Sequence, residues 1–173
     1  ANSLVAVDIT TGAVNTLCQG RDFYSSPRMS PDAVRLSWLC WDHPNMPWDG
    51  TELWLADIDE SGLPRGSRKV AGSNRISVFQ PEWSPDNSLY FVTDESGWWN
   101  LARLDDDGPN SLASFKSEFG LPQWVFGQST YAFSDNSLYC SRITDGVGQL
   151  SRLDPGTLVL EDIKLAQNAF SSV

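Results

Sequence analysis

A unit of roughly 48 residues recurs along this chain and constrains its fold more than any other feature. The aspartates that close the third expected strand of each unit are Asp8, Asp57, Asp105 and Asp154, which gives steps of 49, 48 and 49 residues. Ser-Pro-Asp turns stand at 30–32 and 84–86, each followed by an apolar run. A repeat of this length with four short strands is typical of a β-propeller blade.

We therefore predict an all-β fold, a partial β-propeller of about three four-stranded antiparallel blades plus part of another. The expected units are an incomplete blade at 1–24, blades at 25–72, 73–115 and 116–166, and the start of a next blade at 167–173. The apolar run at 89–92 is bounded by turn residues, so this strand is expected to be covered on both faces. The third blade is expected to have its fourth strand at 112–115, and the fourth blade to have a first strand running from 122 to 133.

Charge and cysteine content exclude several classes of function. The net charge of −10 and the isoelectric point near 4.3 disfavour nucleic acid and anionic membrane surfaces as partners. Apolar runs stay well below the roughly 18 residues of a membrane span. Cys18, Cys40 and Cys140 are odd in number and lack C-x-x-C spacing, which favours reduced structural cysteines in a cytoplasmic protein over a disulfide or a metal site.

The loop at 41–50 has the most unusual composition in the chain. It contains Trp41, Asp42, His43, Trp48 and Asp49, and its two prolines exclude a regular ladder. One interpretation is a substrate-facing or partner-facing loop, because rigid connections that carry aromatic and charged groups are common recognition sites. The alternative is that the aromatic side chains fold back over the blade edge while the aspartates accept hydrogen bonds from backbone amides.

A second candidate is the pair Trp98 and Trp99, which either forms an exposed aromatic platform or buries one ring between blades. In a four-stranded meander, the connections at 41–50, 71–75, 94–99 and 116–120 emerge on one face. The Ser-Pro-Asp turns emerge on the opposite face. We expect the first of these two faces to be the recognition face, since it carries the tryptophans.

Catalytic and cofactor motifs are lacking in the sequence. It has no G-x-S-x-G elbow, no G-x-x-x-x-G-K-[ST] phosphate loop and no zinc-type histidine pair. The acidic run at 105–107 lacks the ligand spacing of an EF-hand. We therefore assign no catalytic, cofactor-binding or metal-binding residue.

Three segments together resemble a known family: His43-Pro-Asn-Met-Pro-Trp-Asp49, Trp98-Trp-Asn-Leu101 and Pro122-Gln-Trp-Val-Phe-Gly127. With the Ser-Pro-Asp units, they resemble the N-terminal β-propeller of the prolyl oligopeptidase family of serine peptidases, most closely its acylaminoacyl-peptidase and dipeptidyl-peptidase-like members. The resemblance covers nearly the whole chain. It implies an α/β-hydrolase domain, missing here, that holds the catalytic serine, aspartate and histidine, and a propeller that admits only short peptides.

Two functions follow as expectations. The chain is either the substrate-gating, non-catalytic part of such a peptidase, or a non-catalytic propeller scaffold that binds a protein partner through its tryptophan-rich loops. A partial propeller leaves the outer faces of its terminal blades without neighbours. We therefore also expect the chain to associate with itself.

Overall fold

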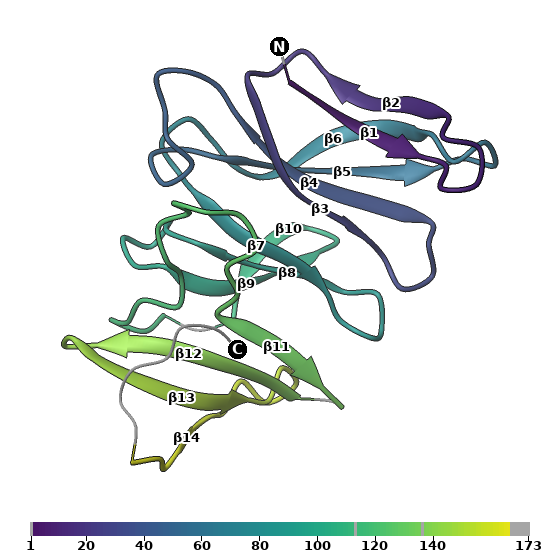
Figure 1. The fold of residues 1–173 in the computed structure, drawn as a ribbon. Coiled ribbons are helices and arrows are strands. Elements are labelled where there is room, and N and C mark those ends of the chain that lie inside the picture. The colour runs from purple at the N-terminus through teal and green to yellow at the C-terminus, as the bar shows by residue number, and fades with distance from the viewer. Residues whose placement is uncertain (1, 113, 136, 167–173) are drawn as a thin grey trace.

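The computed structural model describes residues 2–112, 114–135 and 137–166, and every regular element in these ranges is a β-strand (Figure 1). None of the described residues forms a helix of the length and apolar character that crossing a membrane requires. The strands are β1 Ser3–Val7, β2 Val14–Gln19, β3 Phe23–Met29, β4 Arg35–Trp41, β5 Glu52–Ile58, β6 Pro64–Gly72, β7 Val78–Trp83, β8 Leu89–Thr93, β9 Asn100–Asp105, β10 Gly108–Ser111, β11 Tyr131–Ser134, β12 Ser137–Thr144, β13 Val147–Leu153 and β14 Leu160–Ile163.

The strands form three four-stranded antiparallel sheets and one two-stranded sheet. Within each sheet, β3 to β6, β7 to β10 and β11 to β14 pair in chain order, and β1 pairs with β2. Figure 1 shows the three larger sheets stacked one after another. This arrangement confirms the expected all-β partial propeller. The exact division into blade units remains a prediction, and the expected start of a further blade at 167–173 lies outside the described residues.

Alternation along the central strands provides the core between the sheets. On β8, Leu89 and Phe91 pack toward the β3–β6 sheet, whereas Tyr90 and Val92 pack toward the β11–β14 sheet. All four side chains are at most 3% exposed. Successive side chains of a strand point to opposite faces, so a continuous apolar run fits a strand that lies between two sheets. The expectation that this strand is covered on both faces is confirmed.

The fourth strand of the β7–β10 sheet lies earlier than expected. We expected it at 112–115, but β10 runs from Gly108 to Ser111, and Gly108 pairs with Asp105 across a two-residue turn. Gly108 has a φ of 119°, which a glycine adopts without steric cost. The polar segment 108–111 is therefore itself the fourth strand. Leu112 follows β10 and is buried beside Leu101, which explains its apolar character.

The first strand of the β11–β14 sheet is also shorter than expected. It begins at Tyr131, and residues 122–130 form an irregular connection in place of the predicted strand. Pro122 lacks a backbone donor, and Gly127 has a φ of 81°, outside the range of an extended chain. The segment 122–130 is therefore a long loop that is not part of a sheet.

The Ser-Pro-Asp turns connect β3 to β4 and β7 to β8, at the opposite ends of these sheets from the connections at 41–50 and 94–99 (Figure 1). The backbone N–H of Asn87 donates to the carbonyl of Ser84 over 3.0 Å, and the N–H of Ala33 donates to that of Ser30 over 2.8 Å. The two turns also contact each other, since the backbone N–H of Asp32 donates to Oδ1 of Asn87 over 3.0 Å. The turns thus join adjacent sheets at this face.

All three cysteines are free thiols; Cys40 and Cys140 are buried, and Cys18 is half-buried. Desolvation raises the pKa of Cys18 to about 11 and the pKa of Cys40 and of Cys140 to about 12. Because the thiolate is the reactive form, we expect alkylation of Cys40 and Cys140 by iodoacetamide at pH 8 to be on the order of 100-fold slower in the folded protein than in urea. Mass spectrometry of timed samples measures this ratio. Equal rates in the two states would contradict the buried positions.

Candidate functional site

The start of the 41–50 loop is fixed to the segment that precedes β3. The guanidinium of Arg21 donates to the carboxylate of Asp42 over 2.6 Å and to that of Glu52 over 2.7 Å. The backbone N–H of Asp22 donates to the other oxygen of Asp42 over 2.7 Å. Trp41 is buried at the end of β4 and stacks on Phe23 with ring centroids 5.3 Å apart. Trp41 and Asp42 therefore hold the loop on its sheet.

His43 lies on the outside of this loop, next to Asp22. Its Nδ1 is 2.9 Å from Oδ2 of Asp22, and its side chain is 73% exposed. Two hydrogen bonds from His43 lower the pKa of Asp22: the larger effect comes from its backbone N–H and the smaller from its ring. The pair has the form of a histidine and an orienting carboxylate. A hydrolytic site further requires a nucleophile beside the histidine.

The second half of the loop turns back toward its own sheet and toward the next one. The backbone N–H of Met46 donates to the carboxylate of Asp49 over 2.9 Å, and the side chain of Asn45 donates to the carbonyl of Asn74 over 2.9 Å. A Cβ atom on Gly50 would lie 2.5 Å from the carbonyl carbon of Asn74, so only glycine fits between these segments. Trp48 is half-buried, and the ring centroids of Trp48 and Trp124 are 4.3 Å apart.

The two tryptophans that precede β9, Trp98 and Trp99, have different surroundings. Trp98 is 40% exposed, whereas Trp99 is half-buried against Phe79, with ring centroids 6.2 Å apart. The backbone N–H of Trp99 donates to the carboxylate of Glu118 over 2.9 Å, and a Cβ atom on Gly120 would lie 2.7 Å from the indole of Trp99. One ring of the pair thus packs between segments, and the other is available at the surface.

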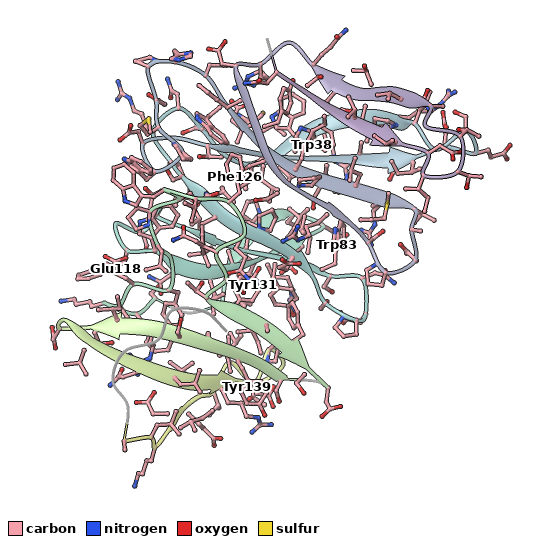
Figure 2. The ribbon with its side chains drawn as sticks, in the orientation of Figure 1. Trp38, Trp83, Glu118, Phe126, Tyr131 and Tyr139 are labelled. Carbon is pink, nitrogen blue, oxygen red and sulfur yellow. The ribbon has the colours of Figure 1, made fainter. Side chains whose placement is uncertain are left out.

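Residues 117–127 join these two loops. Sequence reasoning placed 116–120 on this face but took 122–127 for part of a strand, which the structure does not have. The first part of the 117–127 segment contacts Trp99 through Glu118 and Gly120, and its second part contacts Trp48 through Trp124. Trp124, Val125 and Phe126 are 73%, 62% and 69% exposed. Figure 2 shows Phe126 on this segment, where it passes beside the β3–β6 sheet. A proline and a glycine enclose this apolar run, and these breakers were the available signal for a loop.

We call the surface formed by loops 41–50, 94–99 and 117–127 the loop face. The contacts above connect its three segments, and the Ser-Pro-Asp turns join one another elsewhere. The predicted site residues are therefore divided: Trp41, Asp42 and Trp99 hold the structure together, whereas His43, Asp49 and Trp98 are exposed and Trp48 is half-buried. Their role in binding remains a prediction.

The loop face carries exposed apolar side chains and acidic side chains. Burial raises the pKa of Asp94, although its carboxylate accepts a hydrogen bond from the backbone N–H of Ser77 over 2.7 Å. Glu95 and Glu118 add further negative charge near Asp94. In the described ranges, no group of three His, Cys, Asp or Glu side chains is arranged to hold a metal ion. Such a surface suits ligands with apolar side chains and positive charge.

Comparison with solved structures finds close similarity to peptidases. A puromycin hydrolase shares 35% identity and superposes with a TM-score of 0.86 over 92% of this chain and 25% of its own. A puromycin-hydrolyzing peptidase of Mycobacterium tuberculosis gives 35% identity and a TM-score of 0.86 over 94% of this chain and 25% of its own. Prolyl oligopeptidase B of Galerina marginata, at 12% identity, has a TM-score of 0.62 over 90% of this chain and 22% of its own.

The last of these likenesses shows the fold alone. The chain spans about a quarter of the length of the peptidases it matches. No protein-family model and no curated protein matches the sequence.

Proposed function

The chain belongs to the β-propeller of the prolyl oligopeptidase family of peptidases, and on this premise we propose that it is the substrate-gating, non-catalytic part of a serine peptidase that hydrolyses short peptides. The catalytic α/β-hydrolase domain would be supplied by another part of the same protein. The observation that carries this proposal is the 35% identity to a puromycin hydrolase over 92% of the chain. The three free thiols favour the cytoplasm as its location.

The loop face supports a gating role through its composition. Trp48, Trp124 and Phe126 offer apolar contact area, and the acidic residues near Asp94 favour a positively charged peptide amino terminus. Rigid aromatic side chains select ligands by shape, because they lose little conformational freedom on binding. We therefore assign peptide selection to the loop face rather than to the Ser-Pro-Asp turns.

Two experiments test this function. The gene should encode, in frame with this chain, a G-x-S-x-G motif followed by an aspartate and a histidine. In the complete enzyme, we compare kcat/KM for a dipeptide with kcat/KM for a ten-residue peptide. Trp124→Ala should reduce the dipeptide's advantage, the first value divided by the second, by about tenfold, because truncation of an exposed ring widens the entry. Val34→Ala, at an exposed position beside a Ser-Pro-Asp turn, is the matched control and should leave the ratio unchanged.

The alternative, a scaffold that binds a protein partner, gives a different result. In a scaffold, the protein partner would bind to the same exposed side chains, Trp124, Val125 and Phe126. A gene that encodes only further blades would favour the scaffold and would rule out gating. An equal loss of kcat/KM for short and long peptides in Trp124→Ala would also contradict gating, because it indicates a general defect.

Self-association of the chain is a further expected result. The β1–β2 hairpin and the outer strands β12 to β14 expose a series of apolar side chains: Val5, Val7, Ile9, Val14, Ile143, Val147, Leu158 and Val159, each at least 40% exposed. Covering such surfaces is favourable by roughly 25 cal/mol per Å². Multi-angle light scattering at tens of micromolar should therefore show dimers or larger species, and a uniform monomer would contradict this.

A further inference from the structure

A cavity of about 440 Å³ opens between the β7–β10 sheet and the β11–β14 sheet, beside the second Ser-Pro-Asp turn. Its walls include Asp86 of that turn, Tyr90 of β8, Arg103 of β9, and Phe133 and Asp135 at and just after the end of β11. Asp86 and Asp135 are exposed, so a ligand in the cavity can reach both carboxylates. Phe133 is half-buried and adds an aromatic ring to the same wall as Asp135.

The unpaired charge in this cavity is negative. The guanidinium of Arg103 donates from Nε and Nη2 to the carboxylate of Asp105 over 2.6 and 3.3 Å, so its positive charge is already neutralised. Asp86 accepts hydrogen bonds within its own turn, and the bond from the hydroxyl of Ser84 lowers its pKa. Among the described residues, neither Asp86 nor Asp135 forms an ion pair. Ionised carboxylates beside an aromatic ring favour a cation as the ligand.

The neighbouring junction between sheets shows which cation fits such a space. There, the guanidinium of Arg35 reaches from the β3–β6 sheet to the β7–β10 sheet and lies 4.6 Å from the ring centroid of Trp83. Its Nη2 also donates to the backbone carbonyl of Asn87 over 2.8 Å. At this junction, the chain itself therefore places an arginine against an aromatic ring and a turn of the next sheet.

The corresponding arginine is missing at the junction that contains the cavity. The serine that begins each Ser-Pro-Asp turn donates from its backbone N–H, over 2.9 Å, to the carbonyl of Arg35 in one sheet and of Ser88 in the next. Ser88 therefore has the position of Arg35, but its side chain is much shorter. The aromatic partner is retained, because Trp83 and Phe133 each directly precede a serine at the end of the first strand and pack toward the preceding sheet.

We propose that this cavity binds the guanidinium of an arginine side chain that another protein presents. The carboxylates of Asp86 and Asp135 would accept its hydrogen bonds, and Phe133 would contact it as Trp83 contacts Arg35. A guanidinium keeps its charge at any physiological pH and offers several N–H donors in one plane, which suits carboxylates beside a ring. A basic partner also complements the net charge of −10. The site lies at the Ser-Pro-Asp turns, so it does not rest on the gating function of the loop face.

The test uses the whole chain and two small probes. One probe is N-acetyl-arginine N-methylamide, and the other is its citrulline analogue, in which a neutral urea replaces the guanidinium. In ¹H–¹⁵N NMR titrations, the arginine probe should shift resonances of 84–90 and 133–135 and should bind about tenfold more tightly than the citrulline probe. Asp135→Asn should reduce this preference to about threefold, and the double variant Asp86→Asn with Asp135→Asn should remove it, because the charged acceptors are lost.

Ser88→Arg provides the converse test. The introduced guanidinium should reach the cavity from within the chain, as that of Arg35 reaches the next sheet, and should weaken the arginine probe by about tenfold. Glu60→Gln is the matched control for the loss of one negative charge, since Glu60 is exposed and lies outside the cavity, and it should leave both affinities unchanged. Equal binding of the two probes, or an undiminished preference for the arginine probe in the double variant, would overturn the proposal.

Discussion

Replacing Gly72 with alanine is expected to destabilise the protein by more than about 4 kcal/mol, enough to prevent folding of a marginally stable domain. A Cβ atom at this position would lie 1.9 Å from the carbonyl oxygen of Thr51, which is a backbone atom and not the end of a flexible side chain. Thr51 is fully buried, and its N–H donates to the carbonyl of Ile76 over 3.2 Å. The φ of 75° at Gly72 adds a conformational penalty for any other residue.

Gly66 provides the matched control for this substitution. It lies in the same strand, β6, and has a φ of 62°, but a Cβ atom there would meet nothing within 4 Å. Gly66→Ala should therefore cost only the conformational penalty of about 1–2 kcal/mol. Urea unfolding followed by tryptophan fluorescence compares the two variants. Similar midpoints for Gly72→Ala and Gly66→Ala would show that the close approach of Thr51 is not what requires glycine.

Gln80→Leu is expected to reduce the free energy of unfolding by about 3 kcal/mol and to loosen the β11–β14 sheet first. The side-chain N–H of Gln80 donates to the carbonyl of Tyr131 over 2.7 Å, and its oxygen accepts from the N–H of Thr130 over 2.7 Å. Leucine would leave these buried backbone groups without partners, and each such loss costs about 1–3 kcal/mol. Amide hydrogen exchange of β11 and β12 should accelerate more than that of β4 and β5.

Gln123→Leu is the corresponding control for this prediction. Gln123 is also buried, at 8% exposure, but its side chain donates only a weak hydrogen bond of 3.4 Å, to the carbonyl of Val78, among the residues that the structure describes. Its replacement should cost about 1 kcal/mol or less. If the two variants lose the same stability, the network around Gln80 does not join the sheets as we describe.

The stacking of the sheets could be predicted from the sequence because it follows from local patterns. The recurrence of aspartates such as Asp57 and Asp105, the apolar run at 89–92 and the two Ser-Pro-Asp turns each reflect short-range chemistry that can be read from the sequence. The paired tryptophans also met one of the two expectations, with Trp99 packed and Trp98 exposed.

The loop face could be predicted only in part. Residues 41–50 and 94–99 are connections whose face follows from the meander topology, but the course of 117–127 depends on contacts distant in sequence. These contacts include Trp124 with Trp48 and Gln123 with Val78. Contacts between residues distant in sequence leave no periodic pattern in the sequence, so the apolar segment 122–127 was taken for a strand. The bulges at Ser26 in β3 and at Gln80 in β7 are not revealed by the sequence pattern either.

The course of the 117–127 segment limits how far this propeller is modular. Repeat proteins often tolerate exchange or duplication of a unit, because each unit touches only its immediate neighbours. Here, one connection contacts Trp48 from an earlier sheet, Trp99 from the next and Ile143 from the sheet that follows. A chimera that imports the β7–β10 sheet from a relative would therefore need that relative's 41–50 and 117–127 segments as well.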